Sequence, residues 1–217
     1  MSEWRRDFLT GRWTIIAPER INRPYEFEEG ASGCPFCEGM EAWTPEEVFS
    51  IRRDGTLPNH PGWFVRVFPN KYPALRKDVP LWSMRDGLYQ VTSGFGVHEV
   101  IVETPYHALD FSELPEEQIT RVLAAYRERL RAFEGEKDLR YGLIFKNQGI
   151  EAGASMRHAH SQFIATPVVP RAVLEEIEGA IAFYQEKKQC PFCVMLERER
   201  ERALRLVLES DHFVVFV

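Results

Sequence analysis

The sequence of 217 residues has no run of about 18 apolar residues, the length that a helix needs to cross a bilayer. Its start, from Met1 to Asp7, carries charges with no apolar segment behind them, so it does not resemble a secretory signal. We therefore predict a cytoplasmic protein that has no membrane partner.

An excess of basic residues is also absent. The 27 Lys and Arg against 33 Asp and Glu leave a formal net charge of −6. Binding to a nucleic-acid backbone needs clustered Lys and Arg, whose contacts with phosphates release counterions. We therefore expect no nucleic-acid partner, although a local basic spot can still hold one small phosphate.

Cysteine is scarce, but its four residues form two copies of Cys-Pro-Phe-Cys, which begin at Cys34 and Cys190. In a cytoplasmic chain, this spacing favours metal or redox chemistry over a disulfide framework. Zinc prefers four sulfur and nitrogen ligands, and one such loop supplies two of them. We interpret both pairs as zinc sites, with a redox dithiol as the rival that the repetition disfavours.

Each cysteine pair needs further ligands. Spacing alone does not choose among the histidines of the first half, which are His60, His98, His107, His158 and His160. After the second pair, Cys190 and Cys193, the obvious partner is His212. Three ligands leave that second shell open, so water or a residue beyond Val217 would have to complete it.

Apolar patterns predict the main elements. Strands are predicted over 11–17, 63–68, 97–103, 141–146 and 158–166. A helix is predicted over 115–133 behind the N-cap Ser112, because apolar residues recur there every three to five positions, and a second helix over 173–184.

The two halves are alike, since each has the cysteine tetrapeptide, a connecting segment and an apolar strand. The fold class that we predict is α+β, with two related halves of antiparallel sheet plus helix: residues 1–169 and 170–217. A strand is also predicted over 213–217, and because the second copy stops inside it, we expect that half to be incomplete.

The richest chemical motif is Gly-Ala-Ser-Met-Arg-His-Ala-His-Ser-Gln, residues 153–162. Alternate residues of a strand face the same way, so His158, His160 and Gln162 are predicted to share one surface. A non-functional alternative is that these alternating polar residues form the solvent-exposed face of an edge strand. The preceding Gly153 and Ser155 argue against it, because small residues let backbone N–H groups approach an anion.

A histidine beside an anion site suits nucleophilic catalysis at phosphorus, in which a neutral imidazole attacks and a second phosphate later attacks the phosphoramidate. The attacking nitrogen must be unprotonated, and the ring held at its other nitrogen, for which a backbone carbonyl would serve. Gln162 would donate a hydrogen bond to a phosphoryl oxygen as its charge grows.

Several motifs together resemble the galactose-1-phosphate uridylyltransferase family, within the histidine triad superfamily, over essentially the whole chain. They are 12–17 with Arg20 and Arg23, both cysteine tetrapeptides, 67–75, 104–107, 145–149 and 153–162. The resemblance implies that His160 takes up a uridylyl group and that Gln162 assists. It implies a first zinc held by Cys34, Cys37, His107 and His158. The other implied substrate contacts are Ser155, Asn147, Phe68, Asn70, Arg20 and Arg23.

Two features depart from the family's familiar form. Ala159 replaces a proline between the two histidines, and a second tetrapeptide is present. Both features resemble the two-zinc branch that includes ADP-glucose phosphorylase-like proteins. The choice between a uridine and an adenine nucleotide as substrate therefore stays open. In the family, the chain continues past this point and there supplies hexose contacts.

The resulting prediction is ping-pong transfer of a uridylyl group between UDP-glucose and galactose 1-phosphate through His160. Its substrates are thus a sugar nucleotide and a hexose 1-phosphate, and the resemblance implies a homodimer. The alternatives are an ADP-glucose phosphorylase with phosphate as acceptor, a nucleotide-sugar hydrolase, and a non-catalytic zinc module that binds nucleotides.

Overall fold

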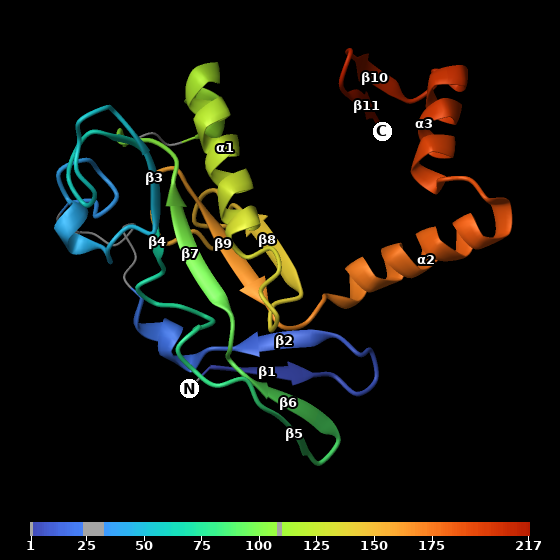
Figure 1. The fold of residues 1–217 in the computed structure, drawn as a ribbon, viewed down its shortest axis with the longest axis horizontal. Helices are drawn as coiled ribbons and strands as arrows, with labels where there is room; N and C mark the ends of the chain where they lie inside the picture. The colour runs from blue at the N-terminus through green and yellow to red at the C-terminus, as the bar shows by residue number, and fades with distance from the viewer. Residues whose placement is uncertain (1, 24–32, 108–109) are drawn as a thin grey trace. The chain divides into compact units, whose positions relative to one another are not determined.

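The computed structural model describes residues 2–23, 33–107 and 110–217, and these fall into two compact units, 1–169 and 170–217 (Figure 1). No helix in the described ranges has the length and apolar character needed to cross a membrane.

The first unit is built on an antiparallel sheet of five strands in the order β3-β4-β7-β9-β8 (Figure 1). These strands are β3 (Phe49–Arg52), β4 (Trp63–Pro69), β7 (Val97–Val102), β9 (His160–Thr166) and β8 (Tyr141–Phe145). Four of them match predicted strands, whereas β3 lies outside every predicted element. The antiparallel pairing confirms the α+β class.

A second antiparallel sheet has four strands in the order β2-β1-β6-β5. They are β1 (Glu3–Arg6), β2 (Trp13–Ile16), β5 (Ser83–Asp86) and β6 (Tyr89–Ser93). Only β2 was predicted. The others are four or five residues long, and β5 is exposed at every position, so they carry no apolar alternation to detect.

Helix α1 (Glu116–Ala132) covers one face of the five-stranded sheet (Figure 1). The predicted helix is confirmed, but its N-cap is Pro115. Ser112 instead lies in the 3₁₀ turn η3 (Phe111–Glu113), where its N–H donates to the capping Asp110. The core between helix and sheet is formed by Val65, Val67, Val97, Ile101, Val122, Ala125, Phe163 and Ala165.

Strand β9 divides its side chains between the two faces of the sheet. Phe163 is fully buried in the core under α1, and Ser161 lies 2.6 Å from the Tyr126 hydroxyl on that helix. His160 and Gln162 therefore project from the opposite face. The strand begins at His160, two residues later than predicted, because His158 lies in a bend with its ring hydrogen-bonded to Thr104. The position of His158 therefore does not follow from the alternation of side chains along a strand.

A close backbone approach at Gly96, just before β7, gives a stability prediction. Its φ is +150°, and an added Cβ would lie 2.6 Å from the Ala165 carbonyl oxygen. We expect Gly96→Ala to lower the free energy of unfolding by about 2–5 kcal/mol, since strained backbone and overpacking each cost about 1–3 kcal/mol.

The matched control is Gly135→Ala, which has a φ of +83° but nothing within 4 Å of an added Cβ. Only the backbone term applies there, about 1–2 kcal/mol. Urea unfolding of both variants measures the difference. Equal losses would contradict the steric role of Gly96.

The second unit contains two helices and a two-stranded antiparallel hairpin. Its elements are α2 (Arg171–Lys187), α3 (Pro191–Arg202), β10 (Leu206–Glu209) and β11 (Val214–Phe216). We predicted α2 and the strand at 213–217. Helix α3 was missed because its second half, Glu197 to Arg202, is charged at every position and shows no apolar face. Its start is nevertheless well marked, by Pro191 in its first turn.

Candidate active site

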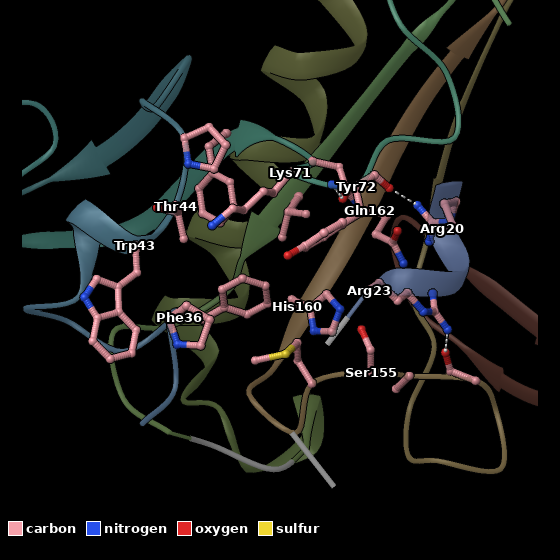
Figure 2. Close-up of a pocket in the computed structure, with 18 residues that line it drawn as sticks. Arg20, Arg23, Phe36, Trp43, Thr44, Lys71, Tyr72, Ser155, His160 and Gln162 are labelled. Carbon is pink, nitrogen blue, oxygen red and sulfur yellow. Dashed lines mark hydrogen bonds between the residues drawn. The ribbon is translucent and has the colours of Figure 1, made fainter. Parts of the chain in front are cut away.

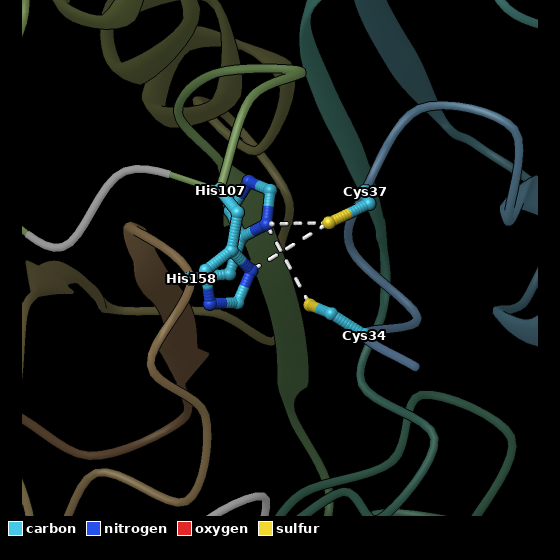
Figure 3. A group of neighbouring side chains, drawn as sticks. All are labelled: Cys34, Cys37, His107 and His158. Atoms are coloured by element: carbon cyan, nitrogen blue, oxygen red, sulfur yellow. Dashed lines mark hydrogen bonds between the residues drawn. The ribbon is translucent and has the colours of Figure 1, made fainter. Parts of the chain in front are cut away.

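Four side chains that could hold a metal ion converge in the first unit. Cys34 and Cys37 come from the loop before the 3₁₀ turn η2 (Glu41–Trp43), His107 from the segment after β7, and His158 from the bend before β9. Their ligand atoms all lie within 4.8 Å of one another (Figure 3). Of the five histidines that spacing left open, the fold brings these two to the first cysteine pair.

The distances in this cluster fit a tetrahedral ion. The Nδ1 of His158 lies 3.6 Å from the sulfur atoms of both Cys34 and Cys37, and the Nδ1 of His107 lies 3.6 Å from Cys37. A tetrahedron with bonds of about 2.3 Å to sulfur and about 2.1 Å to nitrogen has edges of about 3.6 Å. The donor set and its spacing therefore fit a tetrahedral metal ion.

His158 is prepared to act as a ligand through Nδ1. Its Nε2 lies 2.8 Å from the Thr104 carbonyl oxygen and must donate to it, which leaves the Nδ1 lone pair directed at the sulfurs. The side chain is fully buried, and this burial lowers the pKa of His158 to about 4. The ring is therefore neutral at physiological pH, as a metal ligand must be.

The second cysteine pair is arranged differently. Cys190 caps α3 and Cys193 lies in its first turn, both exposed, and a backbone hydrogen bond from Cys193 lowers the pKa of the Cys190 thiol. His212 lies in the turn between β10 and β11. Within the described ranges, it does not join the two cysteines in a group of metal-ligand atoms, and a second zinc at Cys190, Cys193 and His212 stays a prediction. The first tetrapeptide lies in a turn outside any helix, so the two copies also differ in backbone structure.

A pocket lies on the sheet face that carries His160 and Gln162, opposite α1 (Figure 2). Its lining includes Pro35 and Phe36, which lie between Cys34 and Cys37 of the metal cluster. Seven of the predicted catalytic and substrate-binding residues line this pocket: Arg20, Arg23, Phe68, Asn70, Ser155, His160 and Gln162. Asn147 does not line it, although it lies in the same connection between β8 and β9 that carries Ser155. The register explains part of the grouping, since Phe68 of β4 pairs with Val100, which pairs with Gln162.

His160 lies in this pocket with its ring orientation set by the backbone. Its Nδ1 lies 2.8 Å from the His158 carbonyl oxygen, and a carbonyl can only accept, so Nδ1 carries the proton. The lone pair is then on Nε2, the nitrogen required for attack. The side chain is only 8% exposed, and the edge of its ring contacts Phe36 at a centroid distance of 5.3 Å. His158, whose side chain belongs to the group that could hold a metal ion, thus orients His160 through its backbone carbonyl.

Two arginines lie at the rim of the pocket, both held by backbone carbonyls (Figure 2). Arg20, in the 3₁₀ turn η1 (Pro18–Asn22), donates to the Tyr72 carbonyl oxygen at 2.5 Å. Arg23 donates to the Gly153 carbonyl oxygen at 3.2 Å, in the loop that carries Ser155. Two guanidinium groups beside a Gly- and Ala-containing loop make this end of the pocket suitable for phosphate.

The other end of the pocket is aromatic, and of its aromatic residues only Phe68 was predicted from the sequence. Phe36, from the first cysteine tetrapeptide, packs against Phe68 with ring centroids 5.8 Å apart, and Trp43 also lines the pocket. The signal was present in the first cysteine tetrapeptide itself, in which we assigned roles only to the two cysteines. Flat apolar side chains of this kind can stack on a nucleobase.

A buried polar cluster supports β9 from behind the pocket. Glu103 is fully buried and accepts hydrogen bonds from the hydroxyls of Tyr126 and Ser161, while Lys146 forms an ion pair with its other oxygen at 2.6 Å. Burial raises the pKa of Tyr126, so its hydroxyl stays protonated as a donor. The strand that presents His160 is therefore tied on its α1 side by a satisfied polar network.

Comparison with known proteins agrees with this geometry. The family model described as galactose-1-phosphate uridyl transferase, N-terminal domain, matches residues 1–170. The chain is 35% identical to the ADP-glucose phosphorylase of Arabidopsis thaliana, covering 98% of this chain and 60% of that protein. It is 32% identical to the galactose-1-phosphate uridylyltransferase of Thermotoga maritima, covering 100% of this chain and 62% of that protein.

Solved structures show the same likeness. A uridylyltransferase superposes with a TM-score of 0.75 at 33% identity, over 99% of this chain and 60% of that one. An ADP-glucose phosphorylase from Arabidopsis thaliana with bound ADP-glucose gives a TM-score of 0.67 at 33% identity, over 99% and 63%. The chain therefore spans about three fifths of the length of these relatives. It belongs to the galactose-1-phosphate uridylyltransferase family.

Proposed function

We propose that this chain carries the nucleotidyl-transfer site of an enzyme that works by a ping-pong mechanism through a covalent nucleotidyl-His160 intermediate. The observation that carries the proposal is the pairing of His160 with the His158 carbonyl inside a pocket that is aromatic at one end and basic at the other. The aromatic end of that pocket suits the base of a nucleotide, the basic end suits its phosphates, and His160 lies between them (Figure 2).

In the first half-reaction, Nε2 of His160 attacks the α-phosphorus of a sugar nucleotide. The N–P bond forms as the bond from phosphorus to the sugar 1-phosphate oxygen breaks, and the sugar 1-phosphate leaves. The Nδ1 proton remains on the ring, and the His158 carbonyl stabilises the positive charge that the ring acquires. In the second half-reaction, a phosphate oxygen of the acceptor attacks the same phosphorus and releases the neutral imidazole.

The neighbouring side chains have separate tasks in this scheme. Gln162 and Ser155, which line the pocket with His160, donate hydrogen bonds to the α-phosphate oxygens as their charge grows. Arg20 and Arg23 hold the phosphate of the leaving or attacking sugar. Asn70 and Phe68 line the nucleotide end, and a role for Asn147 stays a prediction.

We assign zinc to the cluster of Cys34, Cys37, His107 and His158, because their spacing matches that ion. Zinc, when bound, supplies a rigid tetrahedral anchor and no part of the transfer itself. Held in this way, the His158 backbone keeps its carbonyl in place against the His160 ring. A second zinc at Cys190 and Cys193, a homodimer and a cytoplasmic location stay predictions.

The leading assignment of substrates is UDP-glucose as donor and galactose 1-phosphate as acceptor, supported by the matching family model and by the Thermotoga maritima relative. A second candidate is phosphorolysis of ADP-glucose with phosphate as acceptor. It is favoured by the 35% identity to the Arabidopsis thaliana phosphorylase and by the related structure with bound ADP-glucose. Both use the same histidine.

One experiment separates these candidates. The protein is incubated, without acceptor, with UDP-glucose or ADP-glucose labelled in the nucleoside monophosphate, and acid-labile, base-stable label on protein is measured. We expect label from UDP-glucose that galactose 1-phosphate discharges. Label from ADP-glucose that phosphate discharges would support the second candidate, and equally fast discharge in buffer would indicate a hydrolase. Absence of label from both sugar nucleotides would contradict covalent transfer.

A further inference from the structure

His98 on β7 lies directly beside the pocket residue Gln162. It occupies the same face of the sheet as Val100, one strand period earlier, and Val100 pairs with Gln162 across the β7–β9 ladder. The His98 side chain is 5% exposed, so its ring nitrogens must find partners within the protein. In the sequence, His98 is one of five candidate zinc ligands, and the structure places it outside the metal cluster.

The hydrogen bonds of His98 determine its tautomer. The backbone N–H of Ala74 donates to Nδ1 at 2.9 Å, and a backbone N–H cannot accept, so Nδ1 carries the lone pair. The ring proton is therefore on Nε2, which lies 2.8 Å from Oε1 of Gln162. Burial lowers the pKa of His98 to about 4, and the charge of Arg20 acts in the same direction. The ring thus stays neutral with one defined donor.

This donor decides which end of the Gln162 amide faces the pocket. The Asn70 amide nitrogen also lies 3.2 Å from His98 Nε2, because the Asn70 oxygen accepts from the Tyr72 N–H at 2.9 Å; both nitrogens are donors, so His98 Nε2–H has its acceptor in Gln162. A reversed Gln162 would set its own NH₂ group against the Nε2–H of His98. Its oxygen is therefore held toward His98, which leaves its NH₂ to donate into the pocket.

We propose that His98 is a positioning residue for nucleotidyl transfer, which fixes the Gln162 amide so that its NH₂ meets the phosphoryl group attacked by His160. The inference rests on the proposed function. Without this constraint, the amide could turn its carbonyl oxygen toward the phosphoryl oxygens and repel them as their charge grows.

Two substitutions separate this role from a merely structural one. In His98→Asn, the shorter amide can still accept from Ala74 N–H but cannot reach Gln162. In His98→Gln, the longer amide can place an N–H near the position of Nε2 and donate to Gln162. A structural role predicts that Asn serves at least as well as Gln, whereas positioning predicts the reverse.

The measurement is the rate of label transfer to the protein from the sugar nucleotide that labels the wild type, at saturating concentration. We expect His98→Asn to lower this rate by about 10- to 100-fold, with the nucleotide Kd changed less than about threefold, and His98→Gln to recover most of the loss. The exposed His60→Asn is the matched control and should behave as wild type.

A double-mutant cycle tests whether His98 acts through Gln162. In a Gln162→Met background, we expect His98→Asn to cause no further loss of rate. Equal losses in both backgrounds, or better rates with Asn than with Gln, would overturn the proposal.

A second readout does not depend on activity. The ring ¹⁵N shifts of His98 should show the neutral tautomer protonated at Nε2, and the side-chain amide signals of Gln162 should move in His98→Asn but not in His60→Asn. A ring protonated at Nδ1, or an unmoved Gln162 amide, would refute the inference even in a protein that takes label. Failure of the proposed function would appear separately, as absence of label in the wild type.

Discussion

The substitution His160→Asn is expected to abolish covalent labelling by a sugar nucleotide and to lower overall turnover by about 10⁴-fold or more. Asparagine has an amide nitrogen in the position of Nδ1, so it can still donate to the His158 carbonyl oxygen that holds the wild-type ring. Asparagine has no atom in the position of Nε2. The lone pair of its amide nitrogen is delocalised into the carbonyl, so that nitrogen is not a nucleophile either. The variant therefore removes the nucleophile and retains the local hydrogen bond.

Two controls make this result specific. The metal content and the free energy of unfolding of His160→Asn should stay close to those of wild type, since His160 lies outside the metal cluster. The exposed His60→Asn should take label at the wild-type rate. Undiminished label on His160→Asn would assign the covalent intermediate to another residue.

The second large effect is expected at the metal cluster. Cys34→Ala should lose the bound zinc and lower the free energy of unfolding by about 4 kcal/mol or more, because Cys34 is buried and binding to the folded state contributes directly to stability. Labelling should fall as well, since the cluster anchors His158, whose carbonyl orients His160.

Elemental analysis and urea unfolding, each with and without a chelator, measure this effect. His107→Ala should also weaken zinc binding, with a smaller loss of stability, because His107 is exposed and leaves no buried group unpaired. The control is Cys190→Ala, which lies in the other tetrapeptide and should leave this site unchanged. A chelator that alters neither stability nor labelling of the wild type would argue against a metal at this cluster.

The elements that could be predicted were those with a strong local pattern. Strand β4 is a short run of β-branched and aromatic residues, and helix α1 repeats its apolar residues every three to five positions, because both elements bury side chains in the same core. Strand β5 and helix α3 lack such a pattern and were missed. Their residues form regular structure through backbone pairing or a capped helix start, which an apolar count does not detect.

The sequence by itself determined the chemistry: a strand that presents His160 and Gln162 on alternate positions, a small-residue loop before it, and paired cysteines suited to zinc. Tertiary structure decided which partners complete each group. Cys37 and His107 are 70 residues apart and Cys34 and His158 are 124 apart, and sheet register with loop paths brings them together. Likewise, only the β7–β9 register brings His98 against Gln162. Local patterns determine the side of a strand or helix on which a side chain lies. The residue that it contacts on a neighbouring element depends on long-range strand pairing.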